Sequence, residues 1–251
     1  MWNPFDFTGK KILIAGATSG IGAATASLLA KQGAELVLLG RNKTKLDNLI
    51  QSIDGDIHKK YIVDFSDSVD YKEIFDDVVS DDRKIEGLIY APGIVRLLPV
   101  NSMKRHVMDE TMAINLYAFV DMISILSKKK YHDSASIVGI SSIATEYPQK
   151  GQGIYAASKS AMNAIVTSLA QELVKKNIRI NTVLPGATNT QMYQDSLLDK
   201  PNHEIIKMQE RQILGVSEPI DIAKVILFLL SDASSVITGR AVYADGGFVN
   251  V

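Results

Sequence analysis

The stretch KILIAGATSGIG, residues 11–22, decides the fold because it joins a short apolar run to a loop that contains three glycines. Lys11–Ala15 is continuously apolar after its first residue, which is typical of a strand buried on both faces. The glycines at positions 16, 20 and 22 lead into Ile21–Gln32, whose apolar spacing predicts a helix that stops at Gly33. A strand, a glycine loop and a helix in this order are typical of an α/β sheet that binds phosphate groups.

Outward from this loop, short β-branched runs alternate with longer amphipathic stretches. We expect further strands at Glu35–Leu39, Tyr61–Val63, Leu88–Ala91, Ser136–Ile140, Ile178–Leu184 and Ala241–Tyr243. We expect helices at Thr44–Ile53, Val69–Val79, Lys104–Lys129, Gly153–Lys175 and Pro219–Leu230. Apolar strands separated by helices predict a parallel sheet covered on both faces, with right-handed crossovers. The sequence therefore predicts a doubly wound, Rossmann-type α/β fold of three layers, α/β/α, forming a single domain over residues 1–251.

Composition excludes several classes of function. The 251 residues are 46% hydrophobic and 22% charged, and the formal net charge of −1 gives no attraction to nucleic acid or to anionic membranes. The absence of cysteine removes disulfides, thiolate nucleophiles and zinc–thiolate sites. The histidines at positions 58, 106, 132 and 203 lack ligand spacing, so we expect no metal. The sequence contains no Gly-x-Ser-x-Gly elbow, the motif that would indicate a serine hydrolase.

No segment reads as a targeting or membrane sequence. Met1–Phe7 has neither the basic nor the apolar region of a signal peptide. No apolar run nears the ~18 residues of a membrane span, and the longest candidate, Ile222–Leu230, is interrupted by Lys224. We therefore expect a soluble, cytoplasmic protein.

One long connection without strand character runs from Pro185 to Glu218. An insertion of this length at the carboxyl end of a strand is where a substrate lid would lie. A surface excursion without a role is the alternative. We predict a lid within residues 187–218.

The glycine loop and the end of the next strand predict the cofactor. Gly16 allows a sharp turn, Gly20 lets the backbone approach a pyrophosphate, and Gly22 lets the helix pack close to the strand. An acidic residue at the end of the second strand would favour NAD, but this chain has Gly40 followed by Arg41. The planar guanidinium fits phosphate oxygens, so we predict NADP, although a solvated surface arginine is the alternative.

Four polar residues form a candidate catalytic set. Tyr155 and Lys159 are spaced i and i+4, so they share one face of a helix, and a neighbouring ammonium is expected to lower the pKa of the phenol. Ser142 lies just past the strand that ends at Ile140 and could hold the same carbonyl oxygen as Tyr155; a loop-capping serine is the alternative. Asn115 interrupts an apolar helical stretch, where a buried amide needs partners.

The loop spacing Gly-x-x-x-Gly-x-Gly together with this ordered set resembles the short-chain dehydrogenase/reductase family, and the resemblance spans the whole chain. Ile237-Thr238-Gly239 and Asp245-Gly246-Gly247 match its C-terminal end. The chain departs from the family pattern at Ala15, which replaces threonine, and at Tyr90-Ala91-Pro92-Gly93, where the family commonly has Asn-Asn-Ala-Gly.

The resemblance implies hydride transfer between a nicotinamide and a carbonyl, with Tyr155 as the acid. In the family the asparagine at position 115 binds a water that links Lys159 to solvent, and Asp64 with Phe65 meets the adenine. The resemblance also places the segment Pro185–Thr190 against the nicotinamide. The residues expected to contact the cofactor are Gly16, Thr18, Ser19, Gly20, Ile21, Gly22, Arg41, Asp64, Phe65, Ala91, Gly93, Tyr155, Lys159, Pro185, Gly186, Thr188 and Thr190.

Within the family, the chain is most similar to 3-oxoacyl-(acyl-carrier-protein) reductases, with which it shares Gln152, a candidate substrate contact beside Ser142 and Tyr155. Carrier proteins are acidic, so Lys128–Lys130 and Lys175–Lys176 are candidate docking residues, although such runs are usually solvated helix ends. A sugar, polyol, steroid or other small ketone is the alternative substrate, and a non-catalytic dinucleotide sensor is the alternative class.

The resemblance also implies a homotetramer, or at least a dimer, paired through the two helices that carry Asn115 and Tyr155. Both helices have apolar residues on more than one face, namely Met112, Leu116, Phe119 and Ile123 on the first and Met162, Ile165, Val166 and Leu169 on the second. The apolar tail Ala241–Val251 is a second candidate interface.

Overall fold

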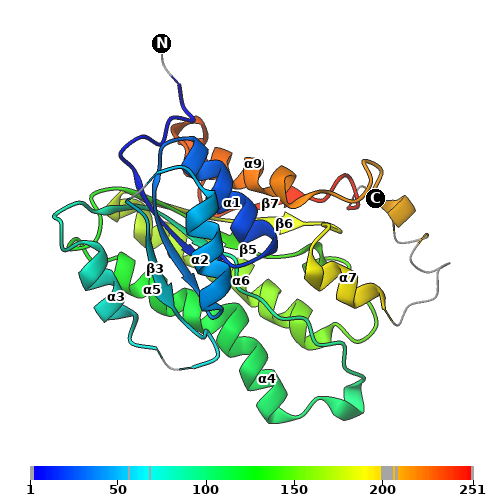
Figure 1. The fold of residues 1–251 in the computed structure, drawn as a ribbon. Helices are drawn as coiled ribbons and strands as arrows, with labels where there is room; N and C mark the ends of the chain where they lie inside the picture. Colours follow the sequence, from blue (N-terminus) through cyan, green and yellow to red (C-terminus); the bar gives the residue numbers. More distant parts are fainter. Residues whose placement is uncertain (1–2, 56, 68, 199–205, 207–208, 250–251) are drawn as a thin grey trace.

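The computed structural model describes residues 3–55, 57–67, 69–198, 206 and 209–249 (Figure 1). Within them one parallel sheet has the strand order β3-β2-β1-β4-β5-β6-β7. Its strands are β1 (Lys11–Ala15), β2 (Glu35–Gly40), β3 (Lys59–Ile62), β4 (Ile85–Tyr90), β5 (Ala135–Ile140), β6 (Ile178–Pro185) and β7 (Ala241–Ala244). The order reverses between β1 and β4, and in such sheets ligands bind at the carboxyl ends of the strands beside this switch point.

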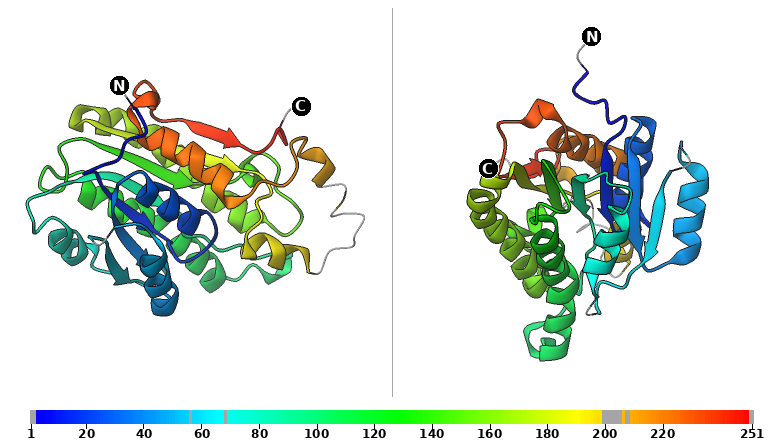
Figure 2. Two further views of the ribbon diagram at one scale, coloured as in Figure 1. Left: turned by 45° about the horizontal axis from the view of Figure 1, so that its top comes forward. Right: turned by 90° about the vertical axis from the view of Figure 1, so that its left-hand side faces the viewer.

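Helices cover both faces of the sheet, as the end-on view in Figure 2 shows. One apolar core lies under α1 (Gly20–Lys31), α2 (Lys43–Ser52) and α9 (Pro219–Leu230). The core on the other face lies under α3 (Tyr71–Val78), α5 (Ala118–Leu126) and α6 (Gly153–Leu173). The helix α4 (Arg105–Met112) leads into α5 through a π turn, and α7 (Gln191–Leu197) follows β6. The predicted doubly wound, three-layer fold is confirmed.

The bounds of two strands differ from the sequence prediction by more than one residue, for identifiable reasons. β3 is Lys59–Ile62 rather than Tyr61–Val63, because it is an edge strand with lysines facing solvent and so lacks a continuous apolar run. β4 begins at Ile85, three residues before the predicted Leu88. Gly87, which obscures this start, is needed there, because a Cβ would lie 2.7 Å from Cδ1 of Ile12.

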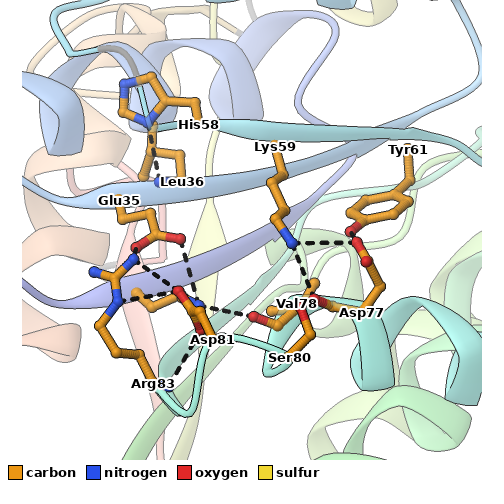
Figure 3. A network of polar contacts seen from close by, with 11 residues as sticks. Glu35, Leu36, His58, Lys59, Tyr61, Asp77, Val78, Ser80, Asp81 and Arg83 are labelled. Carbon is orange, nitrogen blue, oxygen red and sulfur yellow. Dashed lines mark hydrogen bonds and ion pairs between the residues drawn. The ribbon is translucent and has the colours of Figure 1, made fainter.

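A buried network fixes the end of the sheet opposite the glycine loop (Figure 3). The fully buried Lys11 ammonium donates to the carbonyl oxygen of Val78 and to Asp81, at 2.7 Å each. Glu35, 2% exposed at the start of β2, pairs with both Lys11 and Arg83. Buried charges are tolerated only when they are paired, so this network holds β1, β2 and the turn before β4 in one arrangement.

No helix in the described part of the chain is long and apolar enough to cross a membrane. The cytoplasmic location, the single domain over residues 1–251 and the lid within residues 187–218 stay predictions. Residues 199–205 and 207–208 of that segment lie outside the described residues.

Candidate active site

The glycine loop has the backbone geometry that close approach to a ligand requires. Gly16 has a φ of 76°, and a Cβ there would lie 2.8 Å from the backbone nitrogen of Pro92. A Cβ on Gly22 would lie 2.2 Å from the carbonyl oxygen of Gly16, so no other residue fits. The side chain of Ser19, at the N-cap of α1, makes no capping hydrogen bond, which leaves the first N–H groups of the helix available to an anion.

Two cations lie at the end of β2. Arg41 is exposed and lines the cavity described below, and Lys45, in the first turn of α2, lines it as well. Lys45 was not expected from the sequence; its signal is a second basic residue in the helix that begins directly after Arg41 and Asn42. Gly40 lies against Thr18 of the glycine loop, because a Cβ on Gly40 would lie 2.5 Å from Thr18 Cγ2. Any side chain at position 40 would therefore force the Thr18 side chain to shift.

Asp64 stands opposite these cations at the end of β3. Its carboxylate accepts hydrogen bonds from the hydroxyl of Ser66 at 2.7 Å and from the backbone nitrogen of Ser66 at 3.0 Å. These bonds, together with the charge of Arg41, lower the pKa of Asp64, so that the side chain stays ionised at neutral pH. An ionised carboxylate can accept hydrogen bonds from an adenine amine or a ribose hydroxyl.

A cavity of about 480 Å³ runs along the carboxyl ends of the strands, from the glycine loop to α6 and α7. Every residue that the sequence analysis expected to contact the cofactor lines it, and so do Ser142 and Gln152. Asn115 is fully buried and lies behind the lining. The volume of the cavity is within the range of small-molecule sites in proteins.

Tyr155 and Lys159, one turn apart on α6, both line this cavity. Tyr155 is 8% exposed and shares a hydrogen bond with Ser142. The Lys159 ammonium donates to the carbonyl oxygen of Ile140 at 2.6 Å. Burial lowers the pKa of Lys159 to about 7, because the low-polarity surroundings disfavour its charged form.

The phenol differs from the expectation in one respect. Burial raises the pKa of Tyr155, and the hydrogen bond with Ser142 opposes that rise only in part. The net direction is therefore opposite to the expected lowering of this pKa by the ammonium. A raised pKa keeps the phenol protonated at neutral pH, which is the form that can donate a proton.

The two adjacent serines have different partners. Ser141 is buried, and its hydroxyl donates to the carbonyl oxygen of Lys159 at 3.3 Å. Ser142 faces the cavity, where it meets Tyr155, and its oxygen also accepts from the backbone nitrogen of Ala144 at 3.1 Å. Ser142 therefore has the loop-capping contact as well as the position beside the phenol.

Asn115 lies in the π turn Ala113–Tyr117 between α4 and α5. Its amide oxygen accepts from the nitrogen of Ile94 at 2.9 Å, and its amide nitrogen donates to Ile94 O at 3.1 Å and to Ser158 Oγ at 2.9 Å. A Cβ on Gly93 would lie 3.4 Å from Lys159 Nζ and 3.7 Å from the oxygen of Asn115. Glycine at position 93 thus leaves space that touches both groups.

Tyr90, the main departure from the family pattern, supports this turn. Its buried hydroxyl donates to the carbonyl oxygen of Ile114, the residue before Asn115. Its ring packs against Phe65 and Phe119, with centroid distances of 5.9 and 5.1 Å. A π turn changes the spacing of backbone hydrogen bonds and so leaves a carbonyl in need of another donor, and Tyr90 supplies one. The sequence analysis did not assign this role.

The far end of the cavity is formed by residues from three segments. The amide oxygen of Gln152 accepts from the nitrogen of Gln149 at 2.9 Å, and α7 contributes Tyr193 and Ser196. Phe248 is 6% exposed and packs edge-on against Tyr147, which also lines the cavity.

Phe248 belongs to the cavity wall, and residues 250–251 lie outside the described residues, so the tail Ala241–Val251 as a second interface stays a prediction. The expected docking residues need correction. Lys128–Lys130 and Lys175–Lys176 precede β5 and β6, so they lie at the amino ends of the strands, opposite the cavity. Neither lysine run can form a docking patch beside the cavity.

Known proteins resemble this chain over nearly its whole length. A family model described as enoyl-(acyl carrier protein) reductase matches residues 16–249. The 3-oxoacyl-(acyl-carrier-protein) reductase FabG of Thermotoga maritima is 35% identical over 96% of this chain and 98% of its own length. The L-xylulose reductase of Caenorhabditis elegans is 32% identical over 98% of each chain.

Solved structures agree with this fold. A protein from Beutenbergia cavernae, solved with bound NADP at low occupancy, has a TM-score of 0.89 and 25% identity, covering 99% of this chain and 100% of its own. A dehydrogenase/reductase from Sinorhizobium meliloti has a TM-score of 0.89 and 27% identity, covering 98% of this chain and 97% of its own.

Proposed function

Since the chain belongs to the short-chain dehydrogenase/reductase family of oxidoreductases, we propose that it uses NADPH to reduce a ketone or aldehyde to an alcohol. The observation that carries this proposal is that Tyr155, Ser142 and Lys159 all line the cavity that begins at the glycine loop, with Tyr155 hydrogen-bonded to Ser142. A non-catalytic sensor would need the cofactor end of this cavity but not the protonated phenol beside a buried lysine.

In the proposed reaction, the bound cofactor supplies a hydride to the carbonyl carbon and is oxidised. The hydroxyl of Ser142 holds the carbonyl oxygen, and Tyr155 donates its proton to that oxygen as negative charge develops there. Lys159 then returns a proton toward the phenolate. Asn115, held by Ile94 and Ser158, fixes the space beside Gly93 through which a water could resupply Lys159.

Tyr155→Phe tests the chemistry. The variant keeps the buried ring but loses the only proposed proton donor, so turnover of a carbonyl substrate should fall by about two to four orders of magnitude. Binding of NADPH, followed by its fluorescence, should stay within a few-fold of the wild-type value. Near-normal turnover in this variant would refute the assignment of the acid.

The choice of NADP rests on Arg41 and Lys45, which line the cavity where the ribose 2′-phosphate would lie. Arg41→Ala should raise KM for NADPH by about tenfold to a hundredfold, because a charge-assisted contact contributes about 1.5–3 kcal/mol, and should change KM for NADH far less. Lys43→Ala removes an exposed charge two residues away that does not line the cavity, so it is the matched control. Equal changes for both cofactors in Arg41→Ala would exclude this role.

For the substrate, we propose a 3-oxoacyl thioester carried on acyl carrier protein, because several curated relatives are such reductases. A ketopentose is the second candidate, favoured by the L-xylulose reductase relative. Oxidation of NADPH should be measured with a 3-oxoacyl carrier protein, the same acyl group on free pantetheine, and L-xylulose. A preference for the carrier-bound thioester supports the first candidate, equal use of both thioesters excludes a docked carrier, and a preference for L-xylulose supports the second candidate.

A further inference from the structure

The loop after β6 is held by a residue that comes from the far side of the predicted lid. Gln212 is 1% exposed. Its amide oxygen accepts from the backbone nitrogen of Ala187 at 2.8 Å, and its amide nitrogen donates to the carbonyl oxygen of Ala187 at 3.1 Å. The same nitrogen donates to the carbonyl oxygen of Gly215 at 2.6 Å. One side chain therefore satisfies both backbone groups of a residue that lines the cavity.

Two glycines leave room for this side chain. A Cβ on Gly186 would lie 2.5 Å from the amide oxygen of Gln212, and a Cβ on Gly246 would lie 2.8 Å from its Cγ. Gly246 also has a φ of 57°, which disfavours other residues. The glycine at position 246 in the C-terminal motif is thus explained by the space that Gln212 occupies.

We infer that Gln212 is a positioning residue for the nicotinamide half of the cofactor. It fixes the backbone of Gly186–Thr188, which lines the cavity, and ties it to the segment Gln209–Ser217 and to the C-terminal turn. The inference rests on the proposed cofactor, because only a dinucleotide would reach from the glycine loop to this point. Gln212 itself does not line the cavity.

The position in the sheet predicts which half of the cofactor depends on Gln212. The loop follows β6, whereas Arg41 follows β2, four strand positions away in the order β2-β1-β4-β5-β6. At ~4.8 Å for each step, these loops are separated by roughly 19 Å. Loss of the Gln212 contacts should therefore weaken binding of the nicotinamide half and leave the adenosine half unaffected.

The test compares the intact cofactor with its adenosine fragment. Gln212→Met keeps the length and most of the volume of the side chain but removes its hydrogen bonds to Ala187 and Gly215. By calorimetric titration, NADPH should bind about tenfold more weakly than to the wild type, because the backbone nitrogen of Ala187 loses its acceptor and only the nitrogen of Ser217 still donates to its carbonyl oxygen. Adenosine 2′,5′-bisphosphate, which lacks the nicotinamide half, should bind within twofold of the wild-type value.

A second variant covers the case in which Gln212→Met does not fold. Gly246→Ala places a methyl group where Gln212 lies and should give the same selective loss. Gly9→Ala is its matched control, because Gly9 has a similar φ of 77° with nothing within 4 Å of an added Cβ. The control carries the same backbone strain without touching the loop, so its affinity for NADPH should stay at the wild-type value.

Three results would overturn the inference. Equal weakening of NADPH and of the adenosine fragment would indicate general loosening of the fold. Unchanged NADPH binding in both Gln212→Met and Gly246→Ala would show that the loop needs no such support. A wild-type protein that binds the adenosine fragment and NADPH with the same affinity would show that this end of the cavity contributes nothing to cofactor binding. A different result, a wild type that binds neither NADPH nor NADH, would contradict the proposed function itself.

Discussion

Replacing the buried lysine of the candidate active site with methionine should stabilise the protein while abolishing its activity. Lys159 is 3% exposed, and burial lowers its pKa from 10.5 to about 7. Since each tenfold loss of proton affinity corresponds to about 1.4 kcal/mol, keeping this lysine charged in the fold costs about 4 to 5 kcal/mol. Lys159→Met removes that cost and preserves the length and much of the volume of the side chain.

Part of this gain is offset by a lost hydrogen bond. The ammonium donates to the carbonyl oxygen of Ile140 at 2.6 Å, and such a bond to a charged group contributes about 1.5–3 kcal/mol. The net stabilisation at pH 6 should therefore be about 1 to 3 kcal/mol. For a chain of this size that corresponds to a rise in Tm of at least a few degrees, at about 2–4 °C for each kcal/mol.

The pH dependence distinguishes this origin from improved packing. Below pH 7 both the folded and the unfolded wild type carry the proton on Lys159, so the full free-energy cost of burying the charged lysine lowers the stability of the fold. Between pH 7 and 10.5 only the unfolded state binds it, so this lysine destabilises the wild type less as the pH rises. The advantage of Lys159→Met should thus be largest at pH 6 and shrink steadily toward pH 9.

Thermal unfolding of both proteins at pH 6, 7.5 and 9, followed by circular dichroism, measures this difference. Lys31→Met, which removes an exposed lysine at the end of α1, is the matched control and should show no such trend. A Lys159→Met variant that is less stable than the wild type at pH 6, or whose advantage does not depend on pH, would refute the reasoning.

Two further predictions concern the π turn and the assembly. Tyr90→Phe removes the hydroxyl that donates to the carbonyl oxygen of Ile114, so kcat should fall about tenfold and the pH profile of kcat should change, while KM for NADPH stays the same. The control is Tyr71→Phe, which should leave kcat unchanged because the buried Tyr71 hydroxyl has no hydrogen-bond partner among the described residues. Equal kinetics in the two variants would exclude a role for Tyr90. We also expect light scattering to give the mass of a homotetramer. Tyr117 is 51% exposed beside the apolar faces of α5 and α6, so Tyr117→Glu should lower this mass. Ile57→Glu, in the loop before β3, is the control and should leave the mass unchanged. A monomeric wild type at micromolar concentration would contradict the second prediction.

The parts of the site that the sequence predicted are those whose partners are close along the chain. The glycine loop follows β1 directly, and Tyr155 and Lys159 are separated by one helical turn, so local spacing suffices to bring each set together. The role of Gln212 could not be predicted in this way. It lies in a segment without strong periodicity, and its main partner, Ala187, is 25 residues earlier in the chain.

Helix α7 was missed for a related reason. Its seven residues, Gln191–Leu197, span only about two turns and bury no side chain fully, so they are too few to show a helical period in the sequence. What defines its start is Thr190, whose hydroxyl oxygen accepts from the nitrogen of Tyr193 at 3.3 Å. The sequence analysis had assigned Thr190 to the cofactor, and a threonine at an N-cap beside the cavity is compatible with both roles.

Tyr90 shows how a departure from a family pattern can be compensated at a distance. The sequence marks position 90 as unusual, but only the fold brings its hydroxyl to Ile114, 24 residues later, inside the turn that orients Asn115. The ring fills a space against Phe65 and Phe119 that a shorter asparagine side chain would leave open, and Phe65 itself lines the cavity. Because burial raises the pKa of Tyr90 well above 10, its hydroxyl stays a donor throughout the working pH range. The residue that replaces the usual asparagine therefore supports both the proposed proton relay and the wall of the proposed adenosine site.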